Sequence, residues 1–105
     1  MVGRETYYVT TTSELTLSQL AEHRVFVGSG TITVTLPTPG VDYADLDAID
    51  YIQDDATLDT TLSCSNGFPN ALDTVTVTAG QAVRLKCCSD LAGSYTWYVI
   101  GGTAA

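Results

Sequence analysis

Strict alternation of threonine with apolar residues is the feature that most constrains how this chain can fold. The runs TITVTL (31–36) and DTVTVTA (73–79) carry an apolar side chain at every second position. Successive side chains of a β-strand point to opposite faces of a sheet, so each run predicts a strand with one buried and one solvated face. Threonine and valine also favour strands, because their branched side chains suit a pleated surface. We therefore expect an all-β protein.

About eight short strands are expected, which would form a small antiparallel β-sandwich or β-barrel. They cover residues 5–11, 24–28, 31–36, 48–53, 58–63, 73–79, 81–88 and 94–100. The dipeptides Ser29-Gly30 and Ala79-Gly80 predict turns that join neighbouring strands as antiparallel hairpins. Residues 13–23 form the one candidate helix, of one or two turns with Ser13 as its cap. Prolines end the strand at 36, and 65–70 reads as a turn-rich loop.

The length of 105 residues predicts one domain. We expect an extended N-terminal arm at 1–5, the β domain at 6–101 and a flexible tail of small residues at 102–105. No apolar run approaches the roughly 20 residues of a membrane span, and the first residues do not form a signal peptide. Synthesis and assembly in the cytoplasm are therefore expected.

The charge balance is strongly acidic, with 12 acidic and 4 basic residues and a net charge of −8. Such a chain repels phosphate backbones and anionic lipid surfaces, so neither nucleic acid nor a membrane is an expected partner. Residues 42–59 hold seven aspartates and no basic residue. This stretch is interpreted first as a solvated face, next as a contact for a basic patch, and least as a calcium site at Asp45, Asp47 and Asp50, because the EF-hand glycine and glutamate are missing.

Nothing in the sequence supports an enzyme, a cofactor or a bound metal. The single histidine, His23, lies beside Glu22 and Arg24 and outside any catalytic motif, so we interpret it as a surface or edge residue. The three cysteines are interpreted as buried free thiols without metal-ligand spacing. Pairing of Cys64 with Cys87 or Cys88 stays open at this point.

The segment GSYTWYVI (93–100) carries apolar residues on both faces of its expected strand. Trp97 is expected to pack inside the chain, against Val34, Val77 or Val83. Aromatic residues are enriched in interface cores, so Tyr98 or Ile100 is a candidate for contact between subunits of a homotrimer. The arm adds further candidates. The full set of expected interface residues is Val2, Arg4, Tyr7, Tyr95, Tyr98 and Ile100.

Three segments together resemble a small β domain of tailed-bacteriophage structural proteins. They are GSGTITVTLP (28–37), AGQAVRL (79–85) and GSYTWYVI (93–100), in this order. The resemblance covers about residues 7–101, and its motifs are degenerate. Cys87-Cys88 and the acidic stretch at 42–59 depart from the family pattern.

The resemblance implies a binding and assembly module without catalytic residues. A chain of 105 residues without a fibrous repeat looks more like a shell component than a fibre subunit. The implied function is that of a capsid decoration (cement) protein, which stabilises the major capsid protein lattice from the virion exterior. The alternative is a tail-fibre or collar module that binds a host receptor or another tail protein.

Overall fold

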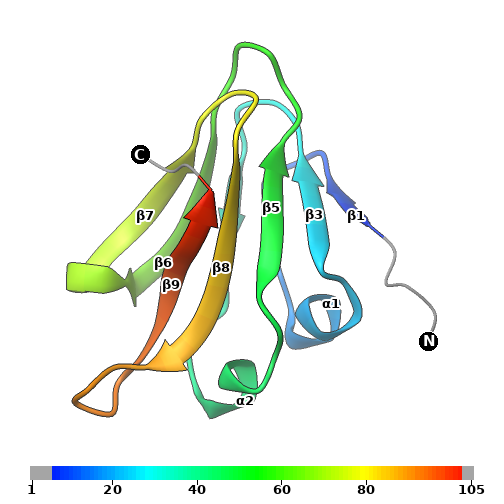
Figure 1. Cartoon of the computed structure of the whole chain (residues 1–105). Helices are drawn as coiled ribbons and strands as arrows, with labels where there is room; N and C mark the ends of the chain where they lie inside the picture. Colours follow the sequence, from blue (N-terminus) through cyan, green and yellow to red (C-terminus); the bar gives the residue numbers. More distant parts are fainter. Residues whose placement is uncertain (1–5, 103–105) are drawn as a thin grey trace.

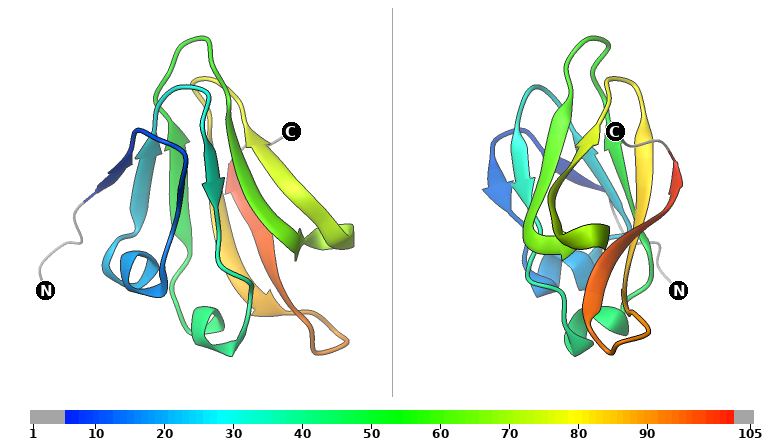
Figure 2. Two further views of the ribbon diagram at one scale, coloured as in Figure 1. Left: turned by 180° about the vertical axis from the view of Figure 1, so that it is seen from behind. Right: turned by 90° about the vertical axis from the view of Figure 1, so that its left-hand side faces the viewer.

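The computed structural model describes residues 6–102 as a β-sandwich of two mixed sheets (Figures 1 and 2). The five-stranded sheet has the order β1 (Tyr7–Val9), β3 (Val25–Gly28), β5 (Ile49–Gln53), β8 (Ala82–Ser89) and β9 (Tyr95–Gly102). The four-stranded sheet has the order β2 (Ser13–Glu14), β4 (Thr33–Thr35), β6 (Thr60–Phe68) and β7 (Leu72–Val77). The helical segments are α1 (Leu17–Glu22), α2 (Val41–Ala44) and the 3₁₀ turn η1 (Pro69–Ala71).

The connections explain why the sheets are mixed. The chain alternates between the sheets from β1 to β6, so the pairs β1–β2, β3–β4 and β5–β6 are stacked side by side in the same orientation. Consequently β1, β3 and β5 run parallel, as do β2, β4 and β6. Antiparallel pairing occurs between β5 and β8 and in the hairpins β6–β7 and β8–β9.

Two sequence predictions about topology are therefore wrong. The turns at Ser29-Gly30 and Ala79-Gly80 do not close antiparallel hairpins, because each carries the chain from one sheet to the other. The alternative of a β-barrel is also wrong, since both sheets end in edge strands, β1 and β9 in one and β2 and β7 in the other. A local turn signal identifies a reversal of the chain but not the sheet in which the next strand lies.

The expected helix is shorter than 13–23 and is capped by Thr16 instead of Ser13. The Thr16 hydroxyl accepts a hydrogen bond from the Gln19 backbone N–H at 3.2 Å, and the Gln19 side chain accepts one from the Thr16 N–H at 2.8 Å. This capping box begins α1. Ser13 instead belongs to β2, a two-residue strand that the alternation did not predict.

The expected inward positions form the core between the sheets. Val34, Val77 and Leu85 are completely buried, and Trp97 is 3% exposed. The Trp97 indole N–H donates to the Pro37 carbonyl at 2.9 Å, so the proline segment after β4 covers this ring. Burial of Trp97 within the chain is thus confirmed.

A buried polar cluster fixes the end of the sandwich where the chain crosses between sheets. The amide of Gln53, which is 1% exposed, donates to the carbonyls of Gly30 at 3.0 Å and Leu58 at 2.8 Å. Its oxygen accepts from the Thr60 hydroxyl at 2.6 Å, and the Gln53 N–H donates to the Gln81 carbonyl at 2.9 Å. Gln53 therefore hydrogen-bonds to three crossing connections. Its side chain bonds to those after β3 and β5, and its backbone N–H bonds to the one after β7.

The remaining boundaries differ in detail. β6 continues to Phe68 through an irregular stretch, so the expected loop at 65–70 is partly strand. Asn66 and Asn70 there have positive φ angles of 52° and 63°, which asparagine tolerates better than most residues. β9 includes Gly102, the first residue of the expected tail. The arm at 1–5 and residues 103–105 lie outside the described residues.

Candidate functional site: the outer face of the five-stranded sheet

The outer faces of the two sheets differ in chemistry. On the four-stranded sheet, alternate positions face away from the core and are hydroxyl-bearing. In register across β4, β6 and β7 they form the rows Thr33, Thr61, Thr76 and Thr35, Ser63, Thr74. We call this surface the hydroxyl face. It is typical of a sheet surface that meets water, and it accounts for the threonines of the alternating runs.

The outer face of the five-stranded sheet carries apolar side chains on all five strands, with the charged residues Asp50, Arg84 and Lys86 between them. One row, in register across β1, β3, β5 and β8, consists of Tyr8, Val27, Ile52 and Ala82. Tyr8 is 69% exposed, and the other three are half-buried. We define the apolar face as this row together with the neighbouring outward residues Val25, Tyr98 and Ile100.

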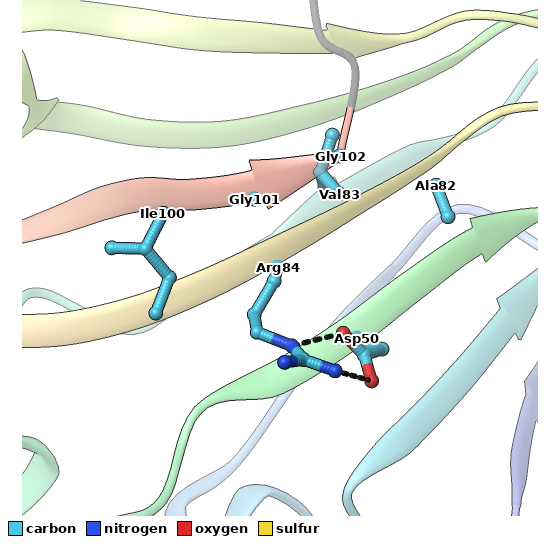
Figure 3. A pocket seen from close by; sticks show the side chains of 7 residues that line it. All are labelled: Asp50, Ala82, Val83, Arg84, Ile100, Gly101 and Gly102. Carbon is cyan, nitrogen blue, oxygen red and sulfur yellow. Dashed lines mark hydrogen bonds and ion pairs between the residues drawn. The ribbon is translucent and has the colours of Figure 1, made fainter.

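One ion pair lies within the apolar face. Asp50 on β5 and Arg84 on β8 are register partners, and the guanidinium donates to both carboxylate oxygens at 2.7 and 3.1 Å. Figure 3 shows these side chains beside Ile100, around a shallow hollow of about 210 Å³. The hydrogen bond and charge of Asp50 raise the pKa of Arg84 above its ordinary value. A second pair, Arg24 with Asp47, lines the adjoining hollow.

The structure separates the predicted interface residues into three groups. Tyr98 and Ile100 lie on the apolar face, where Ile100 is 56% exposed. Tyr7 and Tyr95 pack partly against the core, and the Tyr7 hydroxyl accepts a hydrogen bond from the Gln19 side chain at 2.7 Å. Val2 and Arg4 lie outside the described residues.

Sequence reasoning missed the row through Tyr8, Val27 and Ile52. A usable signal exists, because Val25, Phe26 and Val27 are consecutive apolar residues and therefore cover both faces of one strand. The same pattern in the 93–100 segment led to Tyr98 and Ile100. Which strands lie on either side of β3 is set by tertiary pairing, so the row could not be assembled from one strand alone.

The aspartates at 42–59 serve varied structural roles. Asp55 accepts from the N–H groups of Thr57 and Leu58 at 2.9 and 3.0 Å, and these hydrogen bonds lower its pKa. Asp59 accepts from the Ala79 N–H at 2.8 Å. Within residues 6–102 no three His, Cys, Asp or Glu side chains are grouped so that they could hold a metal ion. The calcium alternative thus has no geometric support in this part of the chain.

The thiols and the histidine have structural surroundings. Cys64 and Cys87 are buried, and burial raises the pKa of both thiols. Cys88 is half-buried, and all three thiols are free in this structure. The His23 ring packs 5.1 Å from Tyr7, measured between ring centroids, at the end of α1.

Comparisons with known proteins do not assign the chain to a family. No family model matches, and neither the curated proteins nor the solved structures contain a significant match. None of the helices in the described range is long and apolar enough to span a membrane. The class defined so far is a two-layer mixed β-sandwich with one apolar and one hydroxyl outer face.

Proposed function

We propose that this chain is a virion assembly module that decorates the outside of a phage capsid and binds the major capsid protein through the apolar face. The observation that carries the proposal is the contrast between the two outer faces. Isolated surface hydrophobic residues are ordinary, but a contiguous apolar surface marks an interaction site. Four neighbouring strands contribute to this row, so the surface is continuous across the sheet.

The chemistry of the apolar face suits a protein partner. Covering its half-exposed aliphatic side chains stabilises a complex by about 25 cal/mol per Å² of apolar surface removed from water. Tyr8 offers a large ring at the edge strand, and aromatic side chains are common binding anchors. The Asp50–Arg84 pair lies in the middle of the face at fixed positions. A partner must place complementary charges opposite the pair, so the pair sets the orientation in which the partner binds.

The net charge agrees with a position outside the shell. A chain with a charge of −8 does not bind the packaged nucleic acid through long-range attraction. A decoration protein is present at every equivalent lattice position, so a modest contact is multiplied over the particle. Such a chain needs a rigid binding face, which a sheet backed by a second sheet provides.

The copy number in purified particles tests the role. Quantitative gel densitometry should find hundreds of copies of the chain in each particle. A few copies would indicate the tail-fibre or collar module instead. Absence of the chain from the particles would contradict both.

A pair of matched variants tests the surface. Ile52→Lys places a charge on the apolar face, and Thr61→Lys places the same side chain on the hydroxyl face, each on an inner strand of its sheet. We expect both variants to fold, as monitored by circular dichroism. Ile52→Lys should lose binding to particles stripped of the chain, and Thr61→Lys should bind like the original protein. Equal binding by the two variants would show that the apolar face is not the contact.

A further inference from the structure

The open side of the sandwich, where β9 ends one sheet and β7 ends the other, contains an apolar groove. Its volume is about 360 Å³, and none of its lining residues is charged. Phe68, Pro69 and Leu72 line it from the four-stranded side, and Val99 lines it from β9. Leu72 is 55% exposed although it belongs to a strand. This groove is separate from the apolar face, which lies on the outer surface of one sheet.

The strand that borders the groove has an unprotected edge. β9 contains eight residues, none of them charged and none proline. Within residues 6–102 its backbone hydrogen-bonds to β8 and to no other strand. Proteins usually protect such edges with lysine, proline or a bulge, because free N–H and C=O groups pair readily with another chain. β9 has only an irregularity at Ile100, so Tyr95–Val99 remain a regular free edge.

We propose that this groove and the β9 edge are the contact between copies of this chain. Two copies that each carry a charge of −8 repel one another, so they can associate most readily where the surface is uncharged. The lining of the groove and the whole of β9 meet this condition. A cationic partner, in contrast, would be drawn to the acidic surfaces elsewhere.

The size of this side is adequate for self-association. Eight residues of β9 extend about 27 Å at about 3.4 Å per residue. Multiplied by 22 Å, the smallest principal extent of the molecule, this length gives a projected area of about 600 Å² per copy. Covering the whole of this area on both copies amounts to about 1,200 Å², the lower end of the range for stable interfaces. Self-association is a property of the isolated chain. This inference rests on the proposed function only for the place of the contact on the virus particle.

The test compares two leucine variants. Leu72→Lys places a charge in the groove, and Leu91→Lys makes the same change at a fully exposed loop residue. Light scattering of the original protein at micromolar concentration should give a mass of at least two chains of 11.1 kDa each. Leu72→Lys should remain folded and raise the dissociation constant about tenfold or more, because a lysine in a closed apolar contact has no partner. Leu91→Lys should associate like the original protein.

Hydrogen exchange provides an independent measurement. Within Tyr95–Val99, the backbone N–H groups that point away from β8 should exchange slowly in the oligomer and faster in Leu72→Lys, with the core strand β5 unchanged. A monomeric original protein would overturn the inference, even where the groove binds a peptide of another protein. An oligomer that Leu72→Lys leaves intact would overturn it as well. Neither result changes the copy-number test, so failure of this contact is distinguishable from failure of the proposed function.

Discussion

Replacement of Gln53 by leucine should destabilise the protein by about 2–3 kcal/mol. Leucine has a similar size, so the change removes the hydrogen bonds of a buried amide without leaving a large cavity. The side chain makes three hydrogen bonds, to Gly30, Leu58 and Thr60. A hydrogen bond contributes about 0.5–1.5 kcal/mol net, and a buried group left without a partner costs about 1–3 kcal/mol.

The structure limits how much of this cost is realised. The Thr60 hydroxyl lies 3.2 Å from the Gly30 carbonyl, so these two groups can satisfy each other when the amide is absent. The Leu58 carbonyl then loses its partner at a residue that is 43% exposed, where water can approach. The expected loss therefore lies near the middle of the range for three bonds. It is a substantial fraction of the roughly 5–15 kcal/mol of a typical domain.

Urea unfolding, followed by the fluorescence of the single tryptophan, measures this loss. Trp97 is 3% exposed, so its emission should be blue-shifted when the chain is folded and move to the red on unfolding. The control is Gln81→Leu, the same change at an exposed side chain of a crossing connection, which should stay within about 0.5 kcal/mol of the original protein. The reasoning is refuted if Gln53→Leu is as stable as the original, or if Gln81→Leu is destabilised to the same extent.

Four further results are expected. Trp97→Ala should lose about 3–5 kcal/mol, and urea unfolding followed by circular dichroism should find it unfolded or close to unfolding. Asp50→Asn should fold with a loss below about 1 kcal/mol in the same measurement, because its ion pair is exposed; a larger loss would show that the pair supports the fold. Cys88 should react with iodoacetamide before Cys64 and Cys87 do. Burial raises the pKa of these last two thiols, so the unfolded chain ionises first as the pH rises; melting temperatures should therefore fall above the ordinary thiol pKa and be insensitive to these thiols below it.

The alternation of apolar and polar residues in this sequence was sufficient to predict most strands and their inward faces. Alternation placed Val34, Val77 and Trp97 in the core, where the structure has them, because a period of two follows from the geometry of one strand. The acidic balance and the uncharged segment at 95–102 are likewise properties of the sequence alone. The acidic balance predicts that the chain repels other anions, and the uncharged segment predicts where its surface is neutral.

Sheet membership was decided only by the tertiary structure. Ser29-Gly30 predicts a reversal, but the choice between a hairpin and a crossing to the other sheet depends on which strands can bury their apolar sides together. For the same reason Tyr8, Val27 and Ile52 become one surface only when β1, β3 and β5 pair in parallel register. Gln53 is buried because the connections after β3 and β5 meet at its side chain and the connection after β7 meets its backbone N–H. Pairing between residues far apart in sequence is not encoded in any short window, so the apolar face and the groove exist only in the folded chain.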